Sequence, residues 1–600
     1  MKKKFLLPLL SLLCAIFLIA CGGESNSDKK SSNTTASEQS EGGSGTGSQG
    51  STHNAGAQGS THNAGAQGSS LSGQTGPKVT LDAKYLKVLP SHSWGIMKLD
   101  FGNLLDKSEI LKHADVKELF EKSIAKESNN VKSLLKRIYD NPNKSGINVN
   151  HPIYFAITGV GYDYKPARAI ATLAICDVEA FEKVLFTFGI KVKEKNGMMY
   201  ILNDGDEHNA EIAYDANKLV IAVDKYRANI ADYLNLSPDL MAVNSKRFEP
   251  IFKGNEDAMV ALNLKQIVNA VMNENGLSGY KAVVEPFVSD YAMFASLNFA
   301  KGSVDFKINS NIPAAYTDVL NKNFKPATKR HFKYIPGHSY AVFNYGVDFK
   351  QIDLSAMAKL MNIDPDFVKV ANESLRKING DITLAAWIDG YNFEDNENHQ
   401  IMIALDCADN SVFEVLKSIL VYKMDMEPTE VSKDVYALNI NRRLVYNHYT
   451  YEYEYERDGY DYYLMYKDGA IMFMPENLYE MLTNQGEFKP LKKNISGNKI
   501  FASMPNGLVV DPSPIREILS SRAPRNSRQS REDKIMLDLL RMVNNLIVTF
   551  DFINFNASLK LTDGNTNSLK TIVNKFIVLA KQEEERRKDE YRMRTYPDEY

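Results

Sequence analysis

The chain has 600 residues, of which 44% are hydrophobic, and a formal net charge of −3 at pH 7. This length exceeds one ordinary domain and supplies enough apolar material for a large core. A near-neutral chain lacks the basic surface that nucleic-acid binding requires, so we expect no nucleic-acid partner. Only four cysteines occur, and two of them lie within the first 21 residues, so no disulfide framework can be inferred.

The first 21 residues have the pattern of a bacterial lipoprotein leader. Three lysines at positions 2–4 precede an apolar stretch over residues 5–19, and Leu18-Ile19-Ala20-Cys21 closes the pattern. The apolar stretch is too short for a permanent membrane span. Its last four residues resemble a lipobox, so residues 1–20 are predicted to be a signal peptide and Cys21 the lipidated first residue. We therefore expect a membrane partner, bound through an acyl anchor rather than by a spanning helix.

Residues 21–78 are predicted to be a disordered tether. They consist mostly of Gly, Ser, Thr, Asn, Gln and Ala, and the unit QGSTHNAGA occurs at 49–57 and again at 58–66. Such a segment cannot bury enough apolar surface to offset the entropy lost on ordering. As a flexible coil it spans roughly 40 Å, which would hold the folded residues away from the membrane.

One phrase of the sequence occurs twice. Residues 87–94 read KVLPSHSW and residues 333–340 read KYIPGHSY, with Pro90 and Pro336 separated by 336 − 90 = 246 residues. Further stretches recur in the same order, at 171–189 and 401–419, 213–234 and 465–482, and 293–310 and 547–564. We therefore predict two tandem copies of one unit, over residues 79–327 and 328–565. Residues 566–600 follow as a helix that is first amphipathic and then charged.

Each copy is predicted to be an α+β unit built on a largely antiparallel sheet. Apolar residues alternate after each Pro-x-His-Ser phrase, which indicates a strand. Strands outnumber the helices that could connect parallel neighbours, and short turns join several of them. We expect helices on one face of each sheet rather than a doubly wound parallel fold.

No motif with a known mechanism occurs in the chain. It contains no His-Glu-x-x-His, no phosphate-binding P-loop, no G-x-S-x-G nucleophile elbow and no Cys-x-x-Cys pair. We predict no catalytic residue, no metal site and no cofactor, and we favour a protein that is not an enzyme.

Two histidines and two cysteines lie at matching places in the predicted copies. His92 and His338 could be ligands or acid–base groups; alternatively, Pro-x-His-Ser is a turn whose His and Ser satisfy backbone groups at the start of a strand. Cys176 and Cys407 could be reactive or pair with each other, or they could be small buried residues.

A tyrosine-rich run, YTYEYEYERDGYDYYLMY, covers residues 449–466. On a strand, Tyr449, Tyr451, Tyr453 and Tyr455 share one face and the intervening glutamates share the other. Asp458-Gly459 predicts a hairpin turn into the residues that follow. The tyrosines could stack on the sugar rings of a glycan, or they could cover a sheet while the glutamates face water.

The lipobox, the polar tether, LKVLPSHSWGIMKLDFGNLL at 86–105 and SGINVNHPIYFAI at 145–157 together resemble the Bacteroidota lipoprotein family known as domain of unknown function 4836. The resemblance covers about residues 79–565. It implies a Gram-negative envelope lipoprotein of no assigned activity, so it supplies no functional residues. We expect a lipid anchor in the outer membrane, with the periplasmic face and the cell surface both open.

Together these patterns favour a lipid-anchored envelope protein that binds or scaffolds an envelope protein or a glycan. Two alternatives stay open. One is a glycan-binding surface lipoprotein that uses the tyrosine-rich hairpin, and the other is a hydrolase with a carboxylate site between the two copies.

Overall fold

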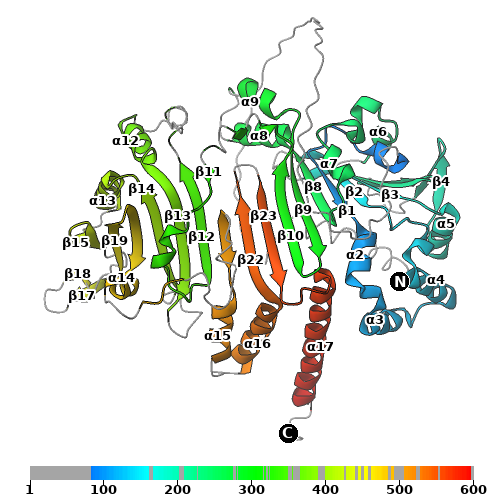
Figure 1. Ribbon diagram of the computed structural model, residues 1–600. Helices are drawn as coiled ribbons and strands as arrows, with labels where there is room; N and C mark the ends of the chain where they lie inside the picture. Colours follow the sequence, from blue (N-terminus) through cyan, green and yellow to red (C-terminus); the bar gives the residue numbers. More distant parts are fainter. Residues whose placement is uncertain are drawn as a thin grey trace, which may run out of the picture. The chain divides into compact units, whose positions relative to one another are not determined.

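The computed structural model describes residues 83–595 apart from internal gaps (Figure 1). The gaps are residues 161–165, 202–208, 226–227, 275–278, 280, 315–316, 319–321, 323, 349, 351–354, 356–364, 390–398, 425–427, 439–442, 448–451, 457–460, 484–487, 492–505, 522–526 and 552–553. Every described residue belongs to one compact unit, Gly76–Tyr600. Cys21 and the predicted tether therefore lie outside the described residues.

The first half of the described chain contains ten strands of the main sheet. They are β1 (Gly95–Leu99), β2 (Ile153–Val160), β3 (Pro166–Ala174), β4 (Val192–Lys195), β5 (Met198–Ile201), β6 (Ala210–Tyr214), β7 (Lys218–Asp224), β8 (Ala258–Asn263), β9 (Ala292–Ala300) and β10 (Ser303–Ser310). Helices and one-turn 3-10 helices lie between them. They are η2 (Lys84–Val88), α2 (Phe101–Ser108), η3 (Ile110–Lys112), α3 (Ala114–Ile124), α4 (Asn129–Asp140), η4 (Pro142–Ser145), α5 (Val178–Thr187), α6 (Ala231–Leu234), η5 (Pro238–Leu240), η6 (Ala242–Asn244), α7 (Glu249–Lys253), α8 (Leu264–Glu274) and α9 (Lys281–Val288).

The second half continues the same sheet. Its strands are β11 (Phe324–Lys325), β12 (Ala341–Asp348), β13 (Ile378–Ile388), β14 (His399–Cys407), β15 (Thr429–Ser432), β16 (Val435–Leu438), β19 (Tyr462–Lys467), β20 (Ala470–Pro475), β21 (Gly507–Val510), β22 (Val543–Phe550) and β23 (Phe555–Leu561). A separate two-stranded sheet is formed by β17 (Arg443–Asn447) and β18 (Glu452–Glu456). The helices are η8 (Arg330–Tyr334), α12 (Pro365–Leu375), α13 (Ser411–Met424), α14 (Glu476–Thr483), α15 (Ser513–Ser521), α16 (Ser527–Met542) and α17 (Ser568–Thr595).

Antiparallel pairing joins the strands of the main sheet, as the sequence predicts. In the first half the strands lie side by side in the order β4-β5-β6-β7-β3-β2-β1-β8-β9-β10. Strand β10 pairs with β23, and the order continues β23-β22-β21-β12-β13-β14-β20-β19-β16-β15. The pairing of β10 with β23, visible in the middle of Figure 1, therefore joins the two halves into one sheet.

The recurring phrase forms the same turn in each half. The hydroxyl of Ser93 donates to the carbonyl of Pro90 at 2.6 Å, and the hydroxyl of Ser339 donates to the carbonyl of Pro336 at 2.8 Å. Both serines are buried, so their hydroxyls need partners inside the protein. The strands predicted after each phrase are β1 and β12, which confirms them.

Helices pack on both faces of the sheet, so the prediction that they cover one face is wrong. Leu464 and Met465 are neighbours on β19, and their side chains point to opposite faces. Met465 lies in a buried cluster with Leu478 of α14, whereas Leu464 lies in a second cluster with Phe413 of α13. Because the strand is apolar on both faces, each face needs its own cover.

We call the two faces of the sheet face A and face B. Face A carries Ile96 and Val342, and both main buried clusters lie on it, beneath η2 and α7 in the first half and beneath η8 and α14 in the second. Face B carries the neighbouring residues Met97 and Phe343. None of the described helices combines the length and the hydrophobicity of a membrane span.

Candidate functional site

Three buried polar side chains lie beneath each of the 3-10 helices η2 and η8. Under η8 they are His331, Asn344 and Thr383, and each is at most 1% exposed. Under η2 they are Tyr85, Lys98 and Tyr154, and each is at most 3% exposed. In both halves the two strand residues stand directly opposite each other, Asn344 against Thr383 and Lys98 against Tyr154. Buried polar groups are uncommon in a core, so these two clusters are the first candidates for a site.

The cluster under η8 holds its histidine in the neutral form. The Thr383 hydroxyl donates to Asn344 Oδ1 at 2.8 Å, so it accepts from His331 Nδ1, which lies 3.0 Å away. Burial lowers the pKa of His331 to about 4, against a weaker opposing effect of Asp381. Its other nitrogen, Nε2, is buried and has no hydrogen-bond partner among the described residues.

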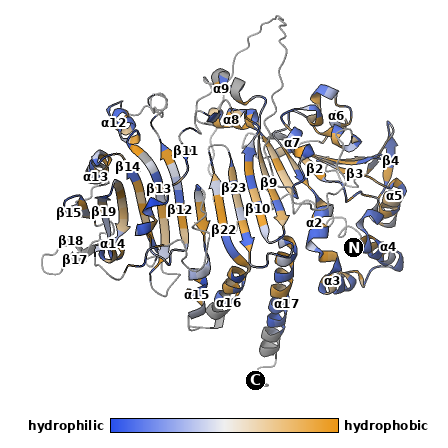
Figure 2. Cartoon of the chain, in the orientation of Figure 1, coloured by the Kyte–Doolittle hydropathy of each residue, from blue (hydrophilic) through white to orange (hydrophobic). Residues whose placement is uncertain are grey.

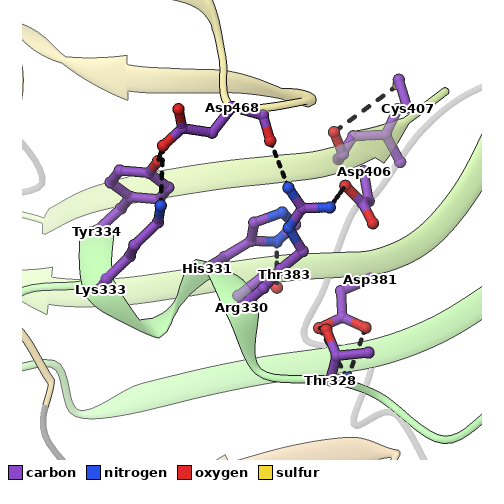
Figure 3. Close-up of polar contacts among 11 residues, drawn as sticks. Thr328, Arg330, His331, Lys333, Tyr334, Asp381, Thr383, Asp406, Cys407 and Asp468 are labelled. Atoms are coloured by element: carbon purple, nitrogen blue, oxygen red, sulfur yellow. Dashed lines mark hydrogen bonds and ion pairs between the residues drawn. The ribbon is translucent and has the colours of Figure 1, made fainter. Parts of the chain in front are cut away.

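An ion-pair network fixes η8 to the ends of the strands beneath it (Figure 3). The Arg330 guanidinium pairs with Asp406 at 2.5 Å and donates to the Asp468 carbonyl. The Asp468 carboxylate accepts from Lys333 at 2.9 Å and from Tyr334 at 2.7 Å, which lowers the pKa of Asp468 to about 2. These contacts connect η8 to β14 and to the turn between β19 and β20.

The cluster under η2 contains a buried amine. Lys98 Nζ donates to the Gly254 carbonyl, and burial lowers the pKa of the Lys98 amine. Burial and the nearby Asp100 raise the pKa values of Tyr85 and Tyr154. The phenol oxygens of both tyrosines, together with His151 Nδ1, are buried without a hydrogen-bond partner in the described residues. Groups of this kind are commonly bridged by internal water.

Neither cluster has the composition of a recognised catalytic or metal centre. Among the described residues, no group of three or more His, Cys, Asp or Glu side chains could hold a metal ion. Burial raises the pKa of the Cys407 thiol to about 12, so this thiol stays protonated at neutral pH. Cys176 is exposed, and both cysteines are free. The arrangement is suited to fixing η2 and η8 in place.

The two predicted histidines do not share a site. His92 and His338 are both exposed, and Ser93 and Ser339 make the backbone hydrogen bonds of their turns. Six strands, β8, β9, β10, β23, β22 and β21, lie between β1 and β12. At about 4.8 Å per strand, β1 and β12 lie about 34 Å apart along the sheet. Because every neighbouring pair between them is antiparallel, β1 and β12 run in opposite directions. The turns that precede these two strands therefore lie at opposite strand ends.

The tyrosine-rich run pairs differently from the prediction. Tyr449 and Tyr451 lie outside the described residues, whereas Tyr453 and Tyr455 lie on β18 opposite Tyr446 and Leu444 of β17. The next strand, β19, pairs with β16 and β20. Asp458 and Gly459 themselves lie outside the described residues. The predicted pairing of the strands on either side of them is wrong, because β18 pairs with β17 and both sides of β19 are taken by β16 and β20.

The junction between the halves contains one satisfied carboxylate. Asp305 of β10 accepts from the hydroxyls of Ser303 at 3.1 Å and Ser558 at 2.5 Å, and Lys560 Nζ lies 4.0 Å away. No second Asp or Glu occurs on β9, β10, β22 or β23. A carboxylate pair on these described strands is thus absent.

Face B is apolar across the middle of the sheet, a feature that the sequence did not lead us to expect. Cross-strand register places these residues of β9, β10, β23 and β22 on it: Leu297, Phe299, Val304, Phe306, Ile308, Phe555, Leu559, Leu546 and Phe550. The neighbouring residues, such as Asn298, Lys307 and Asn556, lie on face A. Hydrophobic and hydrophilic residues accordingly alternate along these strands in Figure 2.

On β1, β9 and β12, three side chains on face B are more exposed than their chain neighbours on face A. Ile96, Phe294 and Val342 on face A are at most 2% exposed. Met97, Met293 and Phe343, which follow or precede them in the chain, are only half-buried. Farther along face B, Ile401 and Ile403 of β14 expose 46% and 38% of their surfaces. An antiparallel sheet usually has a polar face in water and an apolar face that is covered.

Comparison with known proteins identifies the family of this chain but no individual relative. No curated protein and no solved structure matches the chain. The model of one family, described as a domain of unknown function (DUF4836), matches residues 85–503, which is more than half of the chain and includes strands from both halves of the sheet. The chain therefore belongs to the family of the domain of unknown function DUF4836.

Proposed function

We propose that this chain is a lipid-anchored protein of a Bacteroidota cell envelope, placed in the outer membrane, and that it binds a partner without catalysing a reaction. The observation that supports binding is the apolar face B, which carries exposed isoleucines on β14 and half-buried aromatic and aliphatic residues toward β1. Apolar patches of this extent on a protein surface usually mark an interaction site. The leader that ends at Cys21 supports the anchor.

We further propose that the two halves arose as tandem copies of one unit. The separation of 246 residues between the two phrases recurs for the buried polar positions, since 331 − 85 and 344 − 98 both equal 246. The strands of both halves also follow one order of pairing, with β1, β8, β9 and β10 matching β12, β21, β22 and β23. Equal places in the two halves therefore carry equal structural roles.

The anchor is tested by replacing the predicted lipidated residue, Cys21→Ser, and fractionating cells that express the full chain. We expect the wild-type protein in the membrane fraction, with acyl chains detected on Cys21 by mass spectrometry. The variant should lose the acyl group and leave the membrane fraction, because the acyl chains are the proposed attachment to the membrane.

The matched control is Cys176→Ser, which replaces an exposed cysteine of the folded unit. It should remain acylated and in the membrane fraction. An unmodified Cys21 in the wild-type chain would refute the proposed anchor. It would not bear on binding through face B, which is tested separately.

A further inference from the structure

We propose that face B is the surface through which two copies of this chain associate, sheet against sheet. The inference rests on the proposed binding function of face B and names the partner. It follows from the extent of the face, from its lack of charge, and from a group of stacked aromatic rings on it.

The extent of face B is comparable to what a stable dimer needs. Ten described strands, from β1 through β10 and β23 to β14, contribute to it. At about 4.8 Å per strand they span about 43 Å, and three outward residues per strand cover roughly 15–20 Å. The resulting area of roughly 650–850 Å² compares with about 800 Å² per partner in stable complexes.

The chemistry of face B is self-complementary. Two copies of one surface bring equal charges together, so a charged face would repel itself. Between β1 and β14 the residues that the cross-strand register assigns to face B include no Asp, Glu, Lys or Arg among those described. The charges of the central strands, Asp305, Lys307 and Lys560, all lie on face A.

Face B also carries a rigid aromatic group suited to packing between sheets. The rings of Phe343, Tyr345 and Phe550 stack, with centroids separated by 4.7 Å for Tyr345 and Phe550 and 5.7 Å for Phe343 and Phe550. The Tyr345 hydroxyl donates to the Phe550 carbonyl at 2.8 Å, which joins β12 to β22 across β21. Tyr345 is only 4% exposed, so the half-buried rings of Phe343 and Phe550 are the ones that a partner can cover. Preorganised side chains lose little entropy on association, and two sheets normally pack about 10 Å apart.

The test measures the protein mass of the full chain in detergent by light scattering, with the detergent contribution subtracted. We expect the wild-type protein at twice the mass of one chain. Phe306→Glu places a charge in the middle of face B and should give the mass of one chain. Lys307→Glu, which changes a charge on face A of the same strand, is the matched control and should leave the doubled mass unchanged.

A second experiment does not depend on the folding of the charged variant. A photoreactive residue replaces Leu297 on face B or Asn298 on face A, and the membranes are irradiated. We expect a cross-linked product of doubled mass from position 297 and none from position 298.

Three results would overturn the proposed partner. They are a wild-type protein with the mass of one chain, a doubled mass that survives in folded Phe306→Glu, and equal cross-linking from positions 297 and 298. Labelling of position 297 by a phospholipid with a photoreactive acyl chain, in a protein of single mass, would assign face B to lipid instead. If the chain is monomeric but Phe306→Glu abolishes capture of another envelope protein, the proposed binding function stands and only the second copy is wrong.

Discussion

His331 shows how burial at one residue sets the charge of a side chain. It is fully buried beneath η8, and its Nδ1 is satisfied by Thr383 at 3.0 Å. Protonation would place a positive charge in this core near Arg330 and Lys333, and these effects outweigh the attraction of Asp381. The folded protein therefore favours neutral imidazole more strongly than the unfolded chain does.

This difference predicts a loss of stability in mild acid. The pKa of His331 is about 4 in the folded protein and 6.5 for an unperturbed histidine, so between these values the unfolded chain binds more protons. Stability from His331 is present above pH 6.5 and decreases as the pH falls toward 4. From pH 7 to pH 5 this costs about 2 kcal/mol of the free energy of unfolding.

Urea unfolding of the wild type and of His331→Gln at both pH values measures the effect. The loss between pH 7 and pH 5 should be about 2 kcal/mol smaller in the variant, because glutamine does not titrate. His92→Gln, at the exposed histidine, should behave as the wild type does. Equal losses in all three proteins would show that His331 is not held neutral.

At the scale of one element, the start of β21 depends on a glycine. Gly507 has φ of +153°, which side-chain-bearing residues rarely adopt, and a Cβ there would lie 1.9 Å from the Val548 carbonyl oxygen. Its backbone pairs with Asn344 on one side and Thr549 on the other. The close approach of β21 to β22 therefore requires the absence of a side chain.

Gly507→Ala should lower the free energy of unfolding by about 2–3 kcal/mol, because either the backbone or β22 must move. Gly279→Ala is the control, since a Cβ there would meet nothing within 4 Å. That change should stay within about 0.5 kcal/mol of the wild type. Thermal unfolding of both variants measures the difference, and a stable Gly507→Ala protein would contradict the pairing geometry.

The sequence predicted which residues form strands better than it predicted which strands pair with each other. Pro90 and Pro336, followed by alternating residues, were enough to predict β1 and β12, because turn chemistry and period-two alternation are local. The partner of β18 and the covered face of β19 were predicted wrongly, because both depend on residues distant in the chain. The polar cluster of His331 was not singled out, although Lys98 within the apolar phrase GIMKL was a signal of a buried polar site.

At the scale of the whole molecule, the pairing of β10 with β23 should make the two halves unfold together. Six residue pairs join these strands, from Ser303 with Lys560 to Ile308 with Phe555. Unfolding one half would therefore expose an unpaired strand of the other, which costs several hydrogen bonds and the packing around them. This link could not be predicted, because the two edges show no local sign of their partner.

The two tryptophans allow this to be measured, because Trp94 lies in the first half and Trp387 in the second. In Trp387→Phe the fluorescence reports the first half, and in Trp94→Phe it reports the second. Within each variant, we expect the fluorescence transition in urea to coincide with that of circular dichroism, which reports both halves. Separate transitions within one variant would show that the halves unfold independently despite the shared sheet.

The two outermost described strands of the main sheet are poor sites for pairing with another molecule. Among the described residues, β4 and β15 each have one strand neighbour, so each leaves a row of amide groups without a strand partner. Both are only four residues long, with the sequences VKEK and TEVS, and most of their side chains are exposed. Short edge strands with charged side chains disfavour the pairing of another molecule with the sheet through backbone hydrogen bonds. End-to-end polymerisation through β4 and β15 is thereby disfavoured.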